Sequence, residues 1–201
     1  MKIDKKQKLL FVHVPKCAGT SIRDCFNMVS PDGYGLSQPM GQRGNHTPAR
    51  VIKNEEPELW NNAYLKFATI RNPWEVEVSS FFYKMSKTVV LGHPEVHLKT
   101  SLNGFAGFLK AGGIRPMIDF LVDENNEIMV DEILRVENLK QDLDKMCEKY
   151  NLELFKKLEK ANDTSHLNYK DYYKEQWMID FVYKKNESYI KHFKYKFENE
   201  N

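Results

Sequence analysis

The chain has 201 residues, 41% of them hydrophobic and 29% charged, a balance typical of a soluble globular protein long enough for one domain with a full core. Its formal net charge of +2 is too small to indicate nucleic acid as a partner, so any basic site must be local. The charged start MKIDKKQK lacks the apolar stretch of a signal peptide, and no run approaches the roughly 18 apolar residues that cross a bilayer, so we expect a cytoplasmic protein without membrane insertion.

The first half of the chain predicts two buried strands, each followed by a helix. Residues 8–14 (KLLFVHV) form a continuous apolar run, typical of a strand covered on both faces, and a helix is expected over residues 21–28. The stretch 30–47 is rich in Gly, Pro, Ser and Asn and predicts a loop. A helix over about 48–61 then leads to a second buried strand over 63–70.

A helix is expected after the second strand, because Pro73 suits a first helical turn and the apolar residues after it repeat at helical spacing: Trp74, Val78, Phe81, Phe82 and Met85. Further elements are expected in this order: a short helix over 101–110, a hairpin around 124–127, a strand over about 132–136, a helix over 139–150 and helical patterns over about 170–193. Alternating strands and helices predict the α/β class, as a single domain over residues 1–201 with a central, mainly parallel sheet flanked by helices.

Metal sites and disulfide frameworks are not expected. The cysteines are odd in number and show no CxxC pairing: Cys17, Cys25 and Cys147. His93 and His97 stand four apart, a spacing that ligates metal when it lies on a helix. Gly92 and Pro94 argue against a helix there.

The turn between the first strand and its helix, within FVHVPKCAGTSIR (residues 11–23), predicts an anion site. A strand that turns sharply into a helix leaves backbone N–H groups unpaired at the helix start, and these attract an anion such as phosphate. Gly19 allows close backbone approach, and Lys16 adds a mobile positive charge. Thr20 and Ser21 offer hydroxyl donors. The lysine precedes the turn, whereas in the nucleoside-triphosphate loop GxxxxGK[ST] it follows the last glycine, and that pattern does not occur in this sequence.

A second anion site is indicated where the next strand ends. The strand over 63–70 ends in Arg71 rather than in a magnesium-binding Asp, and Ser79 stands eight residues on. An arginine fork with a serine suits a phosphate rather than a metal, and each charge-assisted hydrogen bond is worth about 1.5–3 kcal/mol. Two anion sites on neighbouring strand ends imply a ligand phosphorylated at two places.

These two stretches resemble the motifs of a known family. VPKCAGTS is similar to the 5′-phosphosulfate loop, and IRNPWEVEVSSFFY to the 3′-phosphate motif, of the sulfotransferases that use 3′-phosphoadenosine 5′-phosphosulfate (PAPS), most closely the branch that acts on carbohydrates. Three further segments resemble the family: HTPARVIKNEEPELWNNAYLKFATIRNPW, IDFLVDENNEIMVDEILRVENL and HLNYKDYY. The resemblance implies a P-loop NTPase-like α/β fold whose phosphate motifs lie at the carboxyl ends of parallel strands.

The resemblance also implies roles for individual residues. Lys16 would stabilise charge on the oxygen that bridges phosphate and sulfate, and Arg71 and Ser79 would hold the 3′-phosphate. Backbone and hydroxyl contacts to the donor would come from the loop: Cys17, Ala18, Gly19, Thr20 and Ser21. Family members often carry a second arginine five residues after the first, where this chain has Val76.

His46, in GNHTPAR, matches a histidine that serves as general base in related glycan sulfotransferases. We therefore expect sulfuryl transfer from PAPS to a carbohydrate hydroxyl by in-line displacement, with 3′,5′-adenosine bisphosphate (PAP) as product and without a covalent intermediate or a metal. Four basic residues of two variable loops would suit an acidic acceptor, although solvated surface charge explains them equally well: Arg43, Lys84, Lys87 and Lys99. The resemblance of HLNYKDYY also brings His166 near the donor.

Several alternatives stay open. The bland alternatives are that Lys16 is a solvated loop lysine, Arg71 a structural ion-pair partner and His46 a loop-capping residue. His13, alternating within the first strand, is expected to be packed rather than catalytic. A small-molecule kinase using ATP would require magnesium and a Walker-type lysine. A catalytically inactive nucleotide- or glycan-binding protein on the same scaffold would bind the donor without turnover. The sequence does not determine the oligomeric state.

Overall fold

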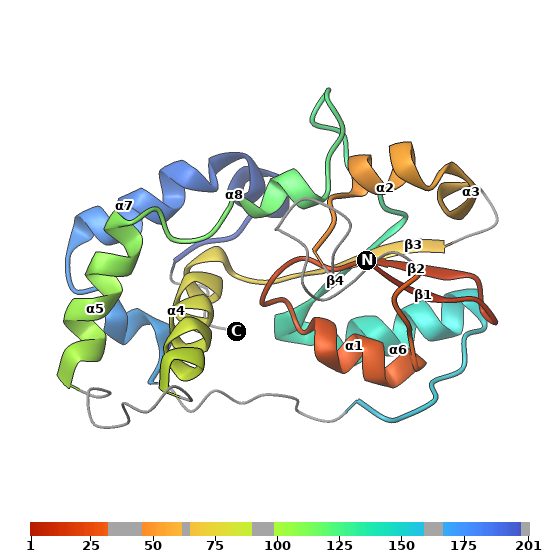
Figure 1. Ribbon diagram of the computed structural model, residues 1–201, viewed down its shortest axis with the longest axis horizontal. Coiled ribbons are helices and arrows are strands. Elements are labelled where there is room, and N and C mark those ends of the chain that lie inside the picture. Colours follow the sequence, from red (N-terminus) through yellow and green to blue (C-terminus); the bar gives the residue numbers. More distant parts are fainter. Residues whose placement is uncertain (32–45, 62–64, 90–98, 159–166, 198–201) are drawn as a thin grey trace. The chain divides into compact units, whose positions relative to one another are not determined.

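The computed structural model describes residues 1–31, 46–61, 65–89, 99–158 and 167–197, and the chain divides into two compact units (Figure 1). Unit 1 consists of Met1–Arg71 and Ile118–Ala161, and unit 2 of Asn72–Met117 and Asn162–Asn201. A single domain over residues 1–201 stays a prediction.

Unit 1 contains a four-stranded sheet in the order β1-β2-β3-β4. Its strands are β1 (Lys2–Asp4), β2 (Leu9–Val12), β3 (Leu65–Ile70) and β4 (Glu132–Arg135). β1 pairs antiparallel with β2, whereas the pairs β2–β3 and β3–β4 are parallel. This mainly parallel sheet confirms the predicted α/β class, and β1 is an edge strand that the sequence did not predict.

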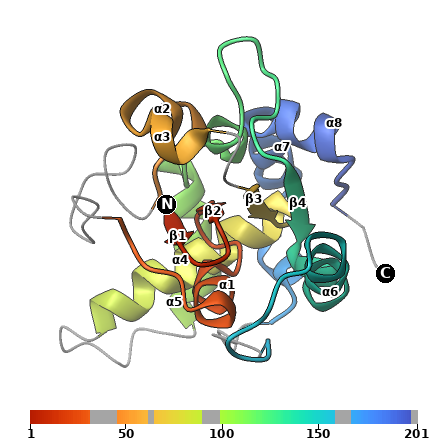
Figure 2. The same ribbon diagram turned by 90° about the vertical axis from the view of Figure 1, so that its right-hand side faces the viewer.

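Helices cover both faces of this sheet, which explains why every residue of β2 is buried. Helices α1 (Gly19–Phe26) and α6 (Leu139–Tyr150) lie on one face, and α2 (Ala49–Glu55) with α3 (Pro57–Trp60) on the other (Figures 1 and 2). The core on the α1 and α6 face is apolar and joins three strands to both helices: Leu9, Phe11, Ile22, Cys25, Phe26, Met28, Phe67, Leu134, Leu143 and Met146.

Two helix boundaries in unit 1 differ from the prediction for local reasons. The helix expected over 48–61 is two helices, because Glu56 precedes Pro57 and has φ −132° and ψ 61°, outside the helical region. The helix expected over 21–28 begins earlier, at Gly19, and ends at Phe26, because Asn27 has a left-handed conformation with φ 51°.

The predicted hairpin around residues 124–127 is present in unit 1. Val122 and Ile128 form an antiparallel bridge, and Asp123 Oδ1 accepts hydrogen bonds from the N–H groups of Asn125 and Glu127. Short 3₁₀ helices flank this region: η2 (Met117–Phe120) and η3 (Val136–Asn138).

Unit 2 is helical and consists of α4 (Pro73–Val89), α5 (Lys99–Lys110), η4 (Tyr169–Tyr172), α7 (Gln176–Lys185) and α8 (Glu187–Phe193). α4 packs against α5, α7 and η4, and three residues of its predicted apolar stripe are buried: Trp74, Val78 and Phe81. The helical patterns expected over about 170–193 are η4, α7 and α8. None of the helices in the described part of the chain is long and apolar enough to span a membrane.

Candidate functional site

The loop between β2 and α1 has the backbone shape of an anion site. Lys16 and Ala18 have left-handed conformations, with φ 61° and 56°, whereas Cys17 between them does not. Such alternation turns successive N–H groups toward one concave side. Ala18 is also the N-cap of α1, and no side chain caps the helix there, so the first N–H groups of the helix are available to an anion.

Two side chains of the β3 strand end hold this loop. Thr69, fully buried, donates from Oγ1 to the carbonyl oxygen of Cys17. Arg71 Nη1 donates to the carbonyl oxygen of Lys16 over 3.4 Å. Because C=O and N–H of a trans peptide point in opposite directions, the N–H groups of Cys17 and Ala18 point away from β3. Sequence reasoning missed Thr69, whose signal is a hydroxyl two residues before the strand-end arginine.

Position 19 needs a glycine because a neighbouring side chain leaves no room for a Cβ, and not because of its backbone torsion angles. A Cβ at this position would lie 1.7 Å from Nε2 of His13, far inside any permitted contact. The structure therefore shows a second reason for glycine at position 19, the close contact with a histidine ring, while close approach to an anion stays a prediction. His13 also stacks on Phe11, with 5.4 Å between ring centroids, and so is packed as its alternation in the strand predicts.

His46 lies beside the same loop in a protonation state suited to a base. Its Nδ1 is 3.0 Å from the carbonyl oxygen of His13. A carbonyl only accepts, so Nδ1 carries the proton and Nε2 keeps its lone pair. Burial, together with the positive charges of Lys16 and Lys2, lowers the pKa of His46, against a raising effect of the His13 carbonyl. The imidazole is therefore neutral at neutral pH.

Unit 1 thus contains eight of the nine predicted site residues. Lys16 and Arg71 are joined through a hydrogen bond, and the charge of Lys16 acts on His46. The rest of the loop follows in chain order, with Thr20 exposed and the others half-buried or buried: Cys17, Ala18, Gly19, Thr20 and Ser21. The ninth, Ser79, is a buried residue of α4 in unit 2.

The start of α4, directly after Arg71, is fixed by Asn72. Its Oδ1 accepts from Trp74 N–H over 3.0 Å, as an N-cap does, and its Nδ2 donates to the carbonyl oxygen of Lys196 over 3.2 Å. Pro73 occupies the first helical turn, as predicted. Val76, at the position of the family's second arginine, is fully buried, so the chain has an apolar core residue there.

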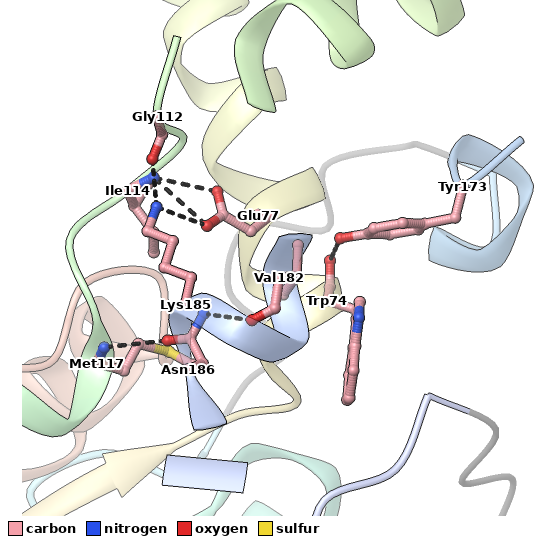
Figure 3. Close-up of polar contacts among 9 residues, drawn as sticks. All are labelled: Trp74, Glu77, Gly112, Ile114, Met117, Tyr173, Val182, Lys185 and Asn186. Atoms are coloured by element: carbon pink, nitrogen blue, oxygen red, sulfur yellow. Dashed lines mark hydrogen bonds and ion pairs between the residues drawn. The ribbon is translucent and has the colours of Figure 1, made fainter. Parts of the chain in front are cut away.

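One turn further along α4, Glu77 is at the centre of a buried polar cluster (Figure 3). Its carboxylate accepts from Ile114 N–H at 3.1 Å and pairs with Lys185 at 3.2 Å, and Lys185 also donates to the Gly112 carbonyl. Burial raises the pKa of Glu77 to about 7, against the opposing effect of Lys185. Tyr173 donates to the Trp74 carbonyl at 2.8 Å, on the same helix.

The other histidines and basic residues singled out in the sequence lie mostly outside the described residues. Arg43, His93, His97 and His166 lie outside the described residues, as do the side chains of Lys87 and Lys99. Lys84 is exposed, with its ammonium 4.7 Å from the centroid of the Phe108 ring. Within the described ranges, no three His, Cys, Asp or Glu side chains gather as a metal site would need.

Comparison with known proteins gives one match. The sequence model of the sulfotransferase family matches residues 1–196. The match includes residues 15–21, called the anion loop below, and also His46, Arg71 and Ser79. No curated protein and no solved structure matches the chain. The family has a P-loop-like fold, in agreement with the mainly parallel sheet. Because the match covers almost the whole chain, this protein belongs to the sulfotransferase family.

Proposed function

We propose that this sulfotransferase transfers a sulfuryl group from PAPS to a hydroxyl group of a carbohydrate. The observation that supports this best is the hydrogen bond from His46 Nδ1 to the His13 carbonyl, because it leaves a neutral imidazole nitrogen unprotonated beside a lysine-bearing anion loop. A general base next to an anion site is what a hydroxyl acceptor requires.

The anion loop fits the phosphosulfate end of such a donor. Its left-handed residues Lys16 and Ala18 and the uncapped start of α1 offer N–H groups, and Lys16 adds a full positive charge. Cys17, Gly19, Thr20 and Ser21 would contribute the remaining backbone and hydroxyl contacts. Arg71 and Ser79 would hold the 3′-phosphate, for which the resemblance to the family motif is the support.

The donor supplies a sulfuryl group activated by its anhydride bond to phosphate. His46 Nε2 accepts the proton of the acceptor hydroxyl as the new S–O bond forms and the bond from sulfur to the bridging oxygen breaks. Lys16 stabilises the negative charge that develops on that bridging oxygen. Proton and charge then balance in one in-line displacement, without a covalent enzyme intermediate and without a metal ion among the participants.

The proposal that the acceptor is a carbohydrate rests on the resemblance to the carbohydrate branch of the family. The exposed ammonium of Lys84 would suit an acidic sugar. A cytoplasmic location stays a prediction.

The test is a thermal-shift titration with PAP against AMP, ADP and ATP plus magnesium. Ligand at about 100 times its Kd adds roughly 2.7 kcal/mol to the free energy of unfolding, which should raise Tm by about 5–10 °C for a protein of this size. A rise with PAP alone, independent of metal, supports the donor site. A response only to ATP with magnesium favours a small-molecule kinase and overturns the proposal.

A matched pair of variants tests Lys16. Lys16→Met should abolish the shift with PAP, whereas Lys53→Met removes an exposed lysine of α2 and should leave it unchanged. Turnover is then measured with radiolabelled PAPS over a panel of carbohydrate acceptors. PAP binding without turnover on any of them favours the inactive nucleotide-binding scaffold instead.

A further inference from the structure

The side chain of His13 has no part in the proposed chemistry, yet its chemical character needs an explanation. It follows β2 directly, and its Nδ1 atom is shielded from solvent. No residue in the described part of the chain forms a hydrogen bond with that atom. A buried polar atom without a partner is unfavourable, so an apolar side chain would serve better if packing were the only role.

His13 makes its first close contact with the anion loop. The backbone of Gly19 lies outside the left-handed region, so its torsion angles would suit any residue. The available space, however, suits glycine alone, because a Cβ would fall 1.7 Å from Nε2 and 2.1 Å from Cδ2 of the His13 ring. The loop and the ring therefore fit together only when position 19 carries no side chain.

The second contact is with the proposed base. The His13 and His46 rings lie 4.3 Å apart between centroids, inclined by 53°. The carbonyl of His13 also accepts from Nδ1 of His46. One residue thus contacts the loop with one edge of its ring and the base with its ring and its backbone.

We propose that His13 is a positioning residue of the sulfotransferase reaction, whose imidazole ring sets the distance between Nε2 of His46 and the anion loop at Gly19. The catalytic consequence rests on the proposed function, because the position of His46 matters to turnover only if His46 is the base. The steric part stands on the contacts of the His13 ring alone.

The His13 ring packs against the His46 ring, and so we expect it to contribute to the burial of His46. Burial is the main cause of the lowered pKa of His46, and the positive charges of Lys16 and Lys2 lower it further. Removing the His13 ring leaves those charges in place and opens the site to solvent. The pKa of His46 should then rise toward that of an exposed histidine, a change that loss of packing elsewhere would not produce.

Four variants test the proposal: His13→Ala, His13→Asn, Gly19→Ala and the double variant His13→Ala/Gly19→Ala. Asn keeps the part of the side chain nearest the backbone and removes the edge that contacts Gly19, so it reports on the contact if His13→Ala does not fold. His192→Ala removes an exposed histidine of α8 and is the control. Thermal unfolding, PAP affinity, turnover and the NMR titration of His46 are measured for each.

Gly19→Ala should lower Tm and weaken PAP binding about tenfold or more, and adding His13→Ala should restore both. His13→Ala and His13→Asn should keep PAP affinity within about threefold, lower kcat at least tenfold and raise the pKa of His46. Gly19→Ala with unchanged Tm, or His13 variants with unchanged kcat and unchanged His46 titration, would overturn the proposal. A wild-type protein that binds no PAP refutes the proposed function instead, and thermal unfolding and the titration still decide the positioning role.

Discussion

Glu77 and Lys185 form an ion pair inside unit 2, with 3.2 Å between Oε1 and Nζ, although 108 residues separate them in the sequence. The Glu77 side chain is only 1% exposed and that of Lys185 14%. Replacing one partner of such a pair leaves a buried charge uncompensated, which costs about 3–5 kcal/mol. The ion pair therefore links α4 to α7.

Lys185→Met should lower the free energy of unfolding by about 3 kcal/mol, measured by urea denaturation at pH 8, where the carboxylate is ionised. Lys184→Met is the matched control, because Lys184 is the exposed neighbour on the same helix; surface substitutions usually change stability by less than about 0.5 kcal/mol. Equal stability of the two variants would show that the pair contributes nothing.

The raised pKa of Glu77 leads to a second prediction, about how the free energy of unfolding depends on pH. In the folded protein the pKa is about 7, above the ordinary value 4.5, so folding binds the proton more tightly. The contribution of protonated Glu77 to the free energy of unfolding is fully present below about pH 4.5 and is lost as the pH rises through 7. At about 1.4 kcal/mol per tenfold change in acidity, the loss between pH 5 and pH 8 amounts to about 3 kcal/mol at most.

Glu77→Gln isolates the pH effect of Glu77, because the amide of Gln does not lose a proton in this pH range. The stability of the wild type relative to Glu77→Gln should fall between pH 5 and pH 8. His13 and His46 act with the opposite sign, since burial lowers their pKa values and their contribution is lost as the pH falls. Both remain in the variant, so they cancel in the comparison. A difference that does not change with pH would refute the raised pKa.

The sequence predicted the elements that local patterns determine. The apolar run over 8–14 and the helix over 139–150 are confirmed as β2 and α6. The three residues of β1 are too few to show a period, and they become a strand only by pairing with β2. Likewise, helical patterns were expected over about 170–193, but not the boundary between α7 and α8 at Asn186, whose backbone leaves the helical region with φ −113° and ψ 23°. The side chain of Asn186 accepts from the Met117 N–H, a contact between distant segments.

In the candidate site, too, local features were predictable from the sequence and contacts between distant segments were not. The turn itself was predictable, because Lys16 and Gly19 stand in one short segment directly after a strand; that it binds an anion stays a prediction. The contacts that shape the turn were not predictable, since Thr69 lies 52 residues and His46 33 residues from their loop partners. Such contacts depend on strand order and register, which one sequence does not contain.

His46→Ala should lower kcat by about 10²–10⁴-fold, the usual contribution of a general base, while PAP affinity stays within about threefold. His192→Ala is the control for loss of an exposed histidine. Turnover at the wild-type level with unchanged PAP binding would show that another group takes the proton.

The pH dependence of kcat should report the same residue. A base acts in its unprotonated form, and the pKa of His46 is lowered from its ordinary value 6.5. The wild type should therefore keep its activity as the pH falls through 6.5 and lose it only in more acidic solution. An acidic limb centred above pH 6.5 would contradict the buried, neutral imidazole.

Thr69→Val should weaken PAP binding about tenfold. The substitution keeps the shape of the side chain and removes the donor to the buried Cys17 carbonyl, a loss of about 1–3 kcal/mol. That hydrogen bond keeps the N–H groups of the loop turned away from β3. Thr69→Ser retains the hydroxyl and should bind PAP within about threefold of the wild type, as calorimetric titration would show. Equal affinities for the Val and Ser variants would mean that the loop keeps its shape without Thr69.

Ser79 and Ser80 provide a matched test of the proposed 3′-phosphate site. Both are buried residues of α4, each 4% exposed. Ser79→Ala should weaken binding of PAP about tenfold, the value of one hydrogen bond to a charged group, and leave AMP, which has no 3′-phosphate, unaffected. Ser80→Ala should change neither, because no described residue forms a hydrogen bond with its Oγ. Calorimetric titration of both ligands measures the ratio of PAP to AMP affinity directly. If Ser79→Ala leaves that ratio unchanged, or Ser80→Ala lowers it equally, the serine of the motif does not bind the 3′-phosphate.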